Sequence, residues 1–295
     1  MKTSELLFLA LLLGGLIFVA SVSFTGLDGG PVMNEASKEI TGKGEEFFVV
    51  YGDTRTNHST HRQVVSVIES YSPEYIINTG DLVENGSRQR DWRYFGEITG
   101  YLKGDYYPAV GNHEAWNRGG KDNFLERFPE VPDEGYYSLK RSGIKFIFLN
   151  QYEDYSPGSK QYDWFREQLR EDQEFPKIAV LHEPHFQANH HANEKTARHL
   201  VPLMEEYGVN AVFYGHTHSF GMARKNGITY VVTGGGGAPL YNPNRETLDI
   251  AFKKHHFVLM EKSGDALEAS VIDKEGTIIH EFSISLEPSP AVVAS

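Results

Sequence analysis

The chain of 295 residues contains no cysteine. This absence excludes disulfide bonds, thiolate nucleophiles and cysteine-ligated zinc sites. Positive charge is also scarce, because 28 lysines and arginines stand against 40 aspartates and glutamates, and the formal net charge is -12. The acidic balance argues against a nucleic-acid backbone or an anionic membrane surface as the partner. Without disulfides the protein must rely on its hydrophobic core, which a chain of this length can build.

Only one long apolar run is present, and it lies at the N-terminus. It extends from Leu6 to Phe24, follows Lys2 and ends among small residues. A run of about 19 residues is near the length that spans a bilayer and is long for the apolar part of a signal peptide. We therefore predict that residues 1–25 are a signal peptide or an N-terminal membrane anchor. The protein is then exported and extracytoplasmic, either secreted or anchored to the membrane.

The rest of the sequence predicts a linker, one domain and a tail. Residues 26–46 hold glycine and polar residues with little periodicity and are predicted to be a linker. From there on, short apolar runs typical of strands alternate with segments of helical periodicity, and the last part is mostly strand. Because no repeat or change of composition divides this region, we predict one α/β domain over residues 47–285. Prolines and small residues predict a frayed tail over residues 286–295.

Polar signatures follow five of the predicted strands at the point where each strand ends. These strands are Phe47–Tyr51, Tyr75–Asn78, Tyr107–Val110, Ile178–Leu181 and Ala211–Tyr214. The signatures that follow them are Gly52-Asp53, Gly80-Asp81, Gly111-Asn112-His113-Glu114, His182 and Gly215-His216-Thr217-His218. In an open α/β sheet, ligands bind at the carboxyl ends of the strands, so we expect these side chains to converge. Carboxylate, amide and imidazole ligands without sulfur suit Mn, Fe, Zn or Ni.

Taken in order, the signatures resemble the calcineurin-like metallophosphoesterase family, whose pattern runs D-x-H, G-D-x-x, G-N-H-D/E, H, G-H-x-H. The match covers residues 47 to 240 and includes the glycine-rich segment Val231–Ala238. One such motif carries little information, whereas five in order after apolar strands are specific. The resemblance implies a two-sheet α/β sandwich in which mixed sheets are flanked by helices.

The resemblance also implies a dinuclear site with two divalent or trivalent metal ions. The implied ligands are Asp53, Asp81 and His218 for the first ion and Asp81, Asn112, His182 and His216 for the second. His113 would be the general acid for the leaving alkoxide, oriented by an acidic neighbour. Two ions can clamp a phosphate and make hydroxide from bound water at neutral pH. The implied reaction is hydrolysis of a phosphate monoester or diester.

The chain departs from the family pattern at Arg55, where the family has a histidine two residues after the first aspartate. A guanidinium stays protonated and cannot ligate a cation. His58 or His61, in the same loop, could supply the missing ligand. Alternatively Arg55 grips the substrate phosphate through its planar fork, and this is the role that we predict. No tyrosine is found among the four residues after Asp81, so the chain is not expected to resemble the tyrosinate-iron purple acid phosphatases.

Two other functions stay open on the sequence. A non-catalytic metal-binding protein that retained the scaffold is supported by Arg55 and opposed by His113, because a structural metal site needs no general acid. A nuclease-type diesterase is opposed by the acidic balance and by the lack of a basic, aromatic-rich stretch. His185, His190 and His191 are more typical of solvated loop residues than of ligands.

The four-glycine run near residue 235 is a further feature of the sequence. It lacks the G-K-S/T ending of a phosphate-binding loop, so it predicts close backbone packing instead.

Overall fold

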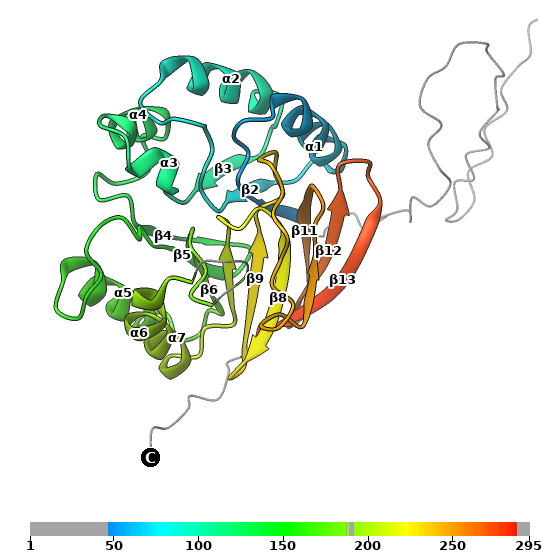
Figure 1. Cartoon of the computed structure of the whole chain (residues 1–295). Coiled ribbons are helices and arrows are strands. Elements are labelled where there is room, and N and C mark those ends of the chain that lie inside the picture. Colours follow the sequence, from blue (N-terminus) through cyan, green and yellow to red (C-terminus); the bar gives the residue numbers. More distant parts are fainter. Residues whose placement is uncertain (1–46, 187, 189–191, 288–295) are drawn as a thin grey trace, which may run out of the picture. The chain divides into compact units, whose positions relative to one another are not determined.

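The structure is a computed structural model that describes residues 47–186, 188 and 192–287 (Figure 1). The predicted signal peptide or anchor (1–25) and linker (26–46) lie outside the described residues, as does the tail from residue 288 on. Within the described ranges, no helix is both long enough and apolar enough to cross a bilayer.

Strands and helices alternate in the first half, and strands predominate at the end. The elements are β1 (Phe47–Tyr51), α1 (His58–Tyr71), β2 (Tyr75–Asn78), α2 (Gln89–Thr99), β3 (Asp105–Pro108), α3 (Asn112–Ala115), α4 (Gly120–Arg127), β4 (Tyr137–Arg141), β5 (Ile144–Phe148), α5 (Lys160–Arg170), β6 (Lys177–Val180), α6 (Glu194–His199), α7 (Val201–Glu206), β7 (Ala211–Tyr214), β8 (Phe220–Lys225), β9 (Ile228–Thr233), β10 (Ile250–Phe252), β11 (His256–Ser263), β12 (Ala266–Asp273) and β13 (Ile278–Ser285).

The strands form two mixed sheets. The first has the order β13-β12-β11-β1-β2-β3, and the second has the order β10-β8-β9-β7-β6-β5-β4. In the first sheet β1, β2 and β3 are parallel, and in the second β5, β6, β7 and β9 are parallel. The registers pair the last residues of β1 and β2, Tyr51 with Asn78, so the chain leaves these strands at the same edge.

The main core lies between the two sheets. It combines side chains of β1, such as Phe48 and Val50, with Phe146 and Phe148 of β5. Helices cover the outer faces (Figure 1): α1 packs on the first sheet, and α5 and α7 pack on the second. The parallel strands β1, β2, β5, β6, β7 and β9 are buried on both faces and therefore read as mostly apolar runs, whereas β3, at the end of its sheet, is partly exposed. The predicted two-sheet α/β sandwich is confirmed.

Some local features differ from what the sequence pattern indicates. The apolar spacing over Ala197–Tyr207 is that of one helix, but the chain forms two short helices there, α6 and α7, with Pro202 in the first turn of α7. Proline lacks the N–H that a continuous helix needs and clashes with the preceding turn, so the helix breaks there. Leu286, the first residue of the predicted tail, is buried in the main core, and its N–H donates to the carbonyl of Asp265 at 2.8 Å.

Candidate metal centre

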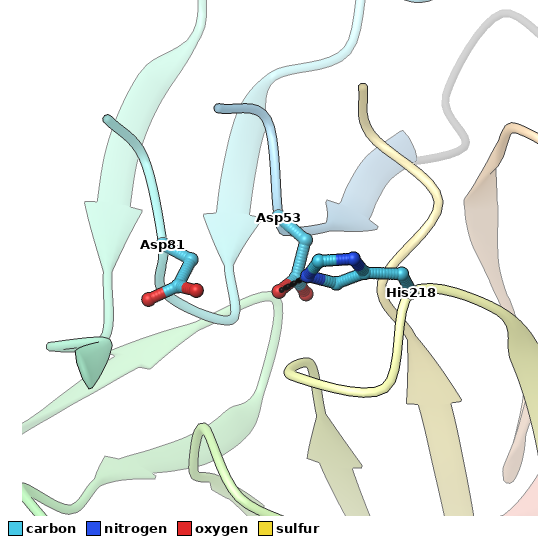
Figure 2. Close-up of side chains that lie close together, drawn as sticks. All are labelled: Asp53, Asp81 and His218. Carbon is cyan, nitrogen blue, oxygen red and sulfur yellow. Dashed lines mark ion pairs between the residues drawn. The ribbon is translucent and has the colours of Figure 1, made fainter. Parts of the chain in front are cut away.

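The polar signatures do meet at one edge of the sheets. Asp53 follows β1, Asp81 follows β2, and His218 precedes β8. Figure 2 shows these three side chains pointing toward one another from three separate segments, and their ligand atoms all lie within 4.8 Å of one another. All three are buried. A metal-binding group of this kind is what convergent strand ends were expected to produce.

The backbone at this edge adopts conformations that side-chain-bearing residues rarely take. Asp53, Asp81, His216 and His218 have positive φ values of 56°, 57°, 66° and 33°. Each such conformation costs of order 1–3 kcal/mol and persists only where the surroundings impose it. The strain therefore falls on the residues whose side chains converge.

Glycines allow the loops to come this close. Gly80 has φ +98°, and a Cβ placed there would lie 2.7 Å from Nδ1 of His182 and 2.9 Å from Cα of Gly111. A Cβ on Gly234 would lie 2.7 Å from Oδ2 of Asp53, and one on Gly235 would lie 2.1 Å from Nδ1 of His256. The prediction that the four-glycine run packs closely against neighbouring residues is confirmed.

A second group of polar atoms, from His182, Asn112 and His216, lies near Oδ1 of Asp81. Nδ1 of His182 donates to the carbonyl of Thr79 at 2.8 Å, so its Nε2 presents a lone pair. That Nε2 lies 3.1 Å from Oδ1 of Asn112 and 3.3 Å from Oδ1 of Asp81. Nδ1 of His216 lies 3.1 Å from the same oxygen of Asn112 and 3.3 Å from Nε2 of His182. Lone pairs that face one another need a proton or a cation between them, and a metal ion fits this group.

In the first group, formed by Asp53, Asp81 and His218, acceptor atoms also face one another. Nδ1 of His218 donates to the carbonyl of Pro239 at 2.8 Å, which leaves the lone pair of Nε2 3.3 Å from Oδ1 of Asp53. Within the part of the chain that the structure describes, that buried oxygen accepts no hydrogen bond. A histidine fixed by a backbone carbonyl on one nitrogen, with an acceptor beside the other, is the usual arrangement of a metal ligand. A cation therefore also fits between Asp53 and His218.

Protons occupy part of this cluster when no ion does. Burial disfavours the charged form of Asp81, yet its contacts with His182 and His113 hold the pKa of its carboxyl well below the usual range. Burial likewise disfavours a charged His182, but Asp81 raises the pKa of this imidazole well above its usual value. Burial and the neighbouring His182 lower the pKa of His216 to about 4. Since ligands must be deprotonated to bind a metal, loading should require the loss of the His182 proton.

Arg55 lies inside the first group. Its Nε lies 3.3 Å from Oδ2 of Asp81, and its Nη2 lies 3.4 Å from Nε2 of His218. Its Nη1 donates to Oε2 of Glu84 at 2.8 Å. Burial disfavours the charged guanidinium, but Asp81, Glu84 and Asp53 together raise its pKa. The loop thus places a fixed positive charge where the family pattern has a histidine ligand.

Neither nearby histidine replaces the missing ligand. The ring of His58 lies against Tyr94, with centroids 4.7 Å apart. His61 is buried with its Nε2 3.4 Å from the hydroxyl of Tyr51, and burial lowers its pKa to about 3. The group formed by Asp53, Asp81 and His218 includes neither of them.

His113 lies at the edge of the cluster with part of its side chain exposed. Its Nε2 is 3.8 Å from Oδ2 of Asp81, and its Nδ1 donates to the carbonyl of Glu84 at 2.5 Å. A backbone carbonyl thus orients the ring through Nδ1, and the acidic side chain beside its other nitrogen is that of Asp81.

Glu114 has a structural role that was not predicted from the sequence. It is fully buried, and its carboxyl oxygens accept backbone N–H groups of Asp81, Leu82, Val83 and Gly111 at 3.0 to 3.3 Å. It therefore fixes the turn that carries Asp81. The only sequence signal was its position as the last residue of the Gly111-Asn112-His113-Glu114 signature.

The remaining histidines of this region do not join the cluster as far as the structure describes them. His185 was expected to be a solvated loop residue, but it is half-buried, and its Nδ1 lies 2.9 Å from the hydroxyl of Tyr214. His190 and His191 lie outside the described residues.

Comparison with known proteins gives a consistent result. Residues 48–220 match the model of the calcineurin-like phosphoesterase family. Among curated proteins, the chain is 28% identical over 196 residues to a probable purple acid phosphatase of Arabidopsis thaliana. The matched segment covers 59% of this chain and 45% of that protein. The chain spans about half the length of the curated relatives that it matches. The resemblance inferred from the signatures is confirmed.

Solved structures share the fold. A purple acid phosphatase from yellow lupin (Lupinus luteus) seeds has a TM-score of 0.69 at 19% identity, covering 82% of this chain and 54% of that chain. GAP50, the anchor in the inner membrane complex of Plasmodium, also has a TM-score of 0.69, at 13% identity, covering 84% of this chain and 90% of that chain.

The expectation that the chain would not resemble purple acid phosphatases is wrong. It rested on one absent tyrosine, whereas the similarity covers more than half of the chain. In the loop after Asp81 this chain instead has Glu84, which binds Arg55.

Proposed function

Because the chain belongs to the calcineurin-like phosphoesterase family, we propose that it hydrolyses phosphate esters at a dinuclear metal site. The observation that carries the proposal is the convergence of lone pairs at Asp81. Oδ1 of this residue faces Nε2 of His182 at 3.3 Å, and Nε2 of His218 faces the unpaired oxygen of Asp53 at the same distance. Metal ions would satisfy these acceptors, and without them a proton on His182 and the guanidinium of Arg55 take part of their place.

The two groups divide the ligands between two ions. One ion would be held by Asp81, Asn112, His182 and His216, and the other by Asp53, Asp81 and His218. When bound, such ions polarise a phosphoryl oxygen and lower the pKa of a bound water. The donor set of carboxylate, amide and imidazole groups suits Mn, Fe, Zn or Ni.

Two further residues of the chain would act on the substrate. His113 has its Nδ1 fixed on the carbonyl of Glu84, so its Nε2 faces the cluster and can deliver a proton to the leaving oxygen. Arg55 is only 13% exposed and has its guanidinium beside Asp81, from where it can grip a phosphate oxygen once it is released from the carboxylate.

Hydrolysis of two chromogenic esters tests the proposal. The full chain would be freed of metal with a chelator, and the release of nitrophenol from para-nitrophenyl phosphate and bis-para-nitrophenyl phosphate would be followed with and without added Mn²⁺. We expect metal-dependent turnover of at least one ester, and the preferred ester would separate a monoesterase from a nuclease-type diesterase. Stoichiometric metal binding without turnover of either ester would favour the non-catalytic scaffold instead.

The place of action is a second part of the proposal. The apolar run Leu6–Phe24 supports export, with the domain secreted or anchored on the extracytoplasmic side and a phosphoester as its substrate. Cell fractionation of the full chain and of a chain lacking residues 1–25 tests this. Retention of both forms in the cytoplasm would refute it.

A further inference from the structure

The guanidinium of Arg55 contacts atoms that an ion held by Asp53, Asp81 and His218 would use. Its Nε lies 3.3 Å from Oδ2 of Asp81, and its Nη2 lies 3.4 Å from Nε2 of His218. Since Nδ1 of His218 donates to Pro239, Nε2 is the nitrogen with the lone pair, and it accepts the guanidinium N–H. One side chain thus provides positive charge and hydrogen bonds to Asp81 and His218, while Oδ1 of Asp53 accepts no hydrogen bond among the described residues.

A clamp holds the guanidinium in this place. Nη1 donates to Oε2 of Glu84 at 2.8 Å and lies 3.2 Å from the hydroxyl of Thr56, which also donates to Glu84. Thr56 itself has φ 73°, a conformation that a β-branched residue adopts only when its surroundings impose it. A planar guanidinium held by a carboxylate loses little further freedom on binding, so its contacts are stronger than those of a loose surface arginine.

The two oxygens of Asp81 face different groups. Oδ2 faces Arg55 at 3.3 Å, whereas Oδ1 lies 3.3 Å from Nε2 of His182. An ion between Oδ1, His182 and Asn112 can therefore bind without moving Arg55. An ion beside Oδ2 and His218 cannot, because a guanidinium does not deprotonate and two cations that share one carboxylate oxygen repel each other.

We infer that Arg55 is a built-in cation that competes with a metal ion for the Asp53–His218 group, so that the two metal places load unequally. In order of binding, the ion held by Asp81, Asn112, His182 and His216 comes first. The ion of the Asp53–His218 group comes second, because it must displace Arg55 from Asp81 and His218, and this frees the guanidinium for a phosphate. The inference rests on the metal places of the proposed function and adds an order of loading and its cause.

Metal titration tests the inference without relying on catalysis. Mn²⁺ would be added to the metal-free full chain, and free Mn²⁺ would be followed by electron paramagnetic resonance. For the wild type we expect one tightly bound ion per chain and a second that is weaker by about tenfold or more, because charge-assisted hydrogen bonds must be broken first.

Substitutions identify the cause of the inequality. Arg55→Gln should tighten the second ion by about tenfold or more and leave the first nearly unchanged. Arg55→His should tighten it at least as much, because an imidazole can also ligate. Arg62→Gln on α1 is the matched control, because it removes the same charge from an exposed side chain. Its only ion pair among the described residues, with Glu97, is 3.9 Å long. This variant should leave the affinity for both ions unchanged. Circular dichroism melts would confirm that each variant is folded.

Two equal affinities in the wild type, no bound ion, or an Arg55→Gln variant whose second ion is no tighter would each overturn the inference. A second ion that tightens in Arg55→Gln, with no ester hydrolysed by the wild type at saturating Mn²⁺, would support the inference and refute the proposed function alone.

Discussion

Replacing Glu114 with glutamine should destabilise the protein strongly although the two side chains have the same shape. Oε2 of Glu114 accepts the N–H groups of Asp81 and Gly111, each at 3.0 Å. Oε1 accepts those of Leu82 and Val83, at 3.0 and 3.3 Å. A glutamine amide has one oxygen and one NH₂ group. Whichever way it is turned, two buried N–H groups will face another donor.

The cost can be worked out from these contacts. A buried N–H that loses its acceptor costs about 1–3 kcal/mol, so two of them cost about 2–6 kcal/mol. Burial disfavours the charged carboxyl and raises the pKa of Glu114, and repulsion from Asp81 adds to this shift. Removing the carboxyl relieves that strain and offsets part of the loss. We expect a net decrease in the free energy of unfolding of about 2–4 kcal/mol.

Urea denaturation of the metal-free protein at pH 7 measures this change. Glu126→Gln, at an exposed position of α4, is the matched control and should stay within about 0.5 kcal/mol of the wild type. Because the turn carries Asp81, Glu114→Gln should also weaken Mn²⁺ binding. A variant as stable as the control would refute the view that this carboxyl holds the turn.

Three other substitutions test separate parts of the account. His113→Ala should lower turnover by about a hundredfold or more while the metal content by elemental analysis stays unchanged, and an equal loss of both would rule out the general-acid role. Burial lowers the pKa of His256 to about 4. Between pH 4 and 6.5 this imidazole is therefore protonated in the unfolded chain but neutral in the folded protein. Wild-type stability should therefore fall as pH drops from 6.5 to 4, and His256→Gln should reduce this slope by about 1.4 kcal/mol per pH unit in denaturation curves; an unchanged slope would contradict the assignment. Gly80→Ala should lose about 2 kcal/mol or more and most of its metal affinity, because a Cβ there meets His182 at 2.7 Å; wild-type Mn²⁺ binding would disprove the close packing.

Of the strands that the signatures follow, β1, β2, β6 and β7 were readable because they are buried on both faces, whereas the partly exposed β3 lies two residues earlier than predicted. The predicted bounds of β1, β2 and β7 agree with the structure. By contrast, β4 and β8 were missed, since Tyr137–Arg141 and Phe220–Lys225 mix polar and apolar residues and lie partly exposed. The break between α6 and α7 could have been predicted from Pro202.

The residues of the site were predictable, but their contacts were not. Ligand types in a fixed order after strands give the set around Asp81 without coordinates. The ion pair between Arg55 and Glu84 joins two loops and depends on their exact approach, so no spacing indicates it. Likewise, the partners of Glu114 are backbone N–H groups of a turn more than thirty residues earlier, and backbone groups leave no trace in a sequence.

The measurement that tests the central claim most directly is anomalous X-ray diffraction at the manganese edge from crystals grown with Mn²⁺. The account predicts a strong peak within coordination distance of Asp81, Asn112, His182 and His216, and a weaker one beside Asp53 and His218. If Mn²⁺ were ordered only elsewhere on the protein, with His182 still paired to Asp81, the claim that this cluster is a metal centre would be contradicted.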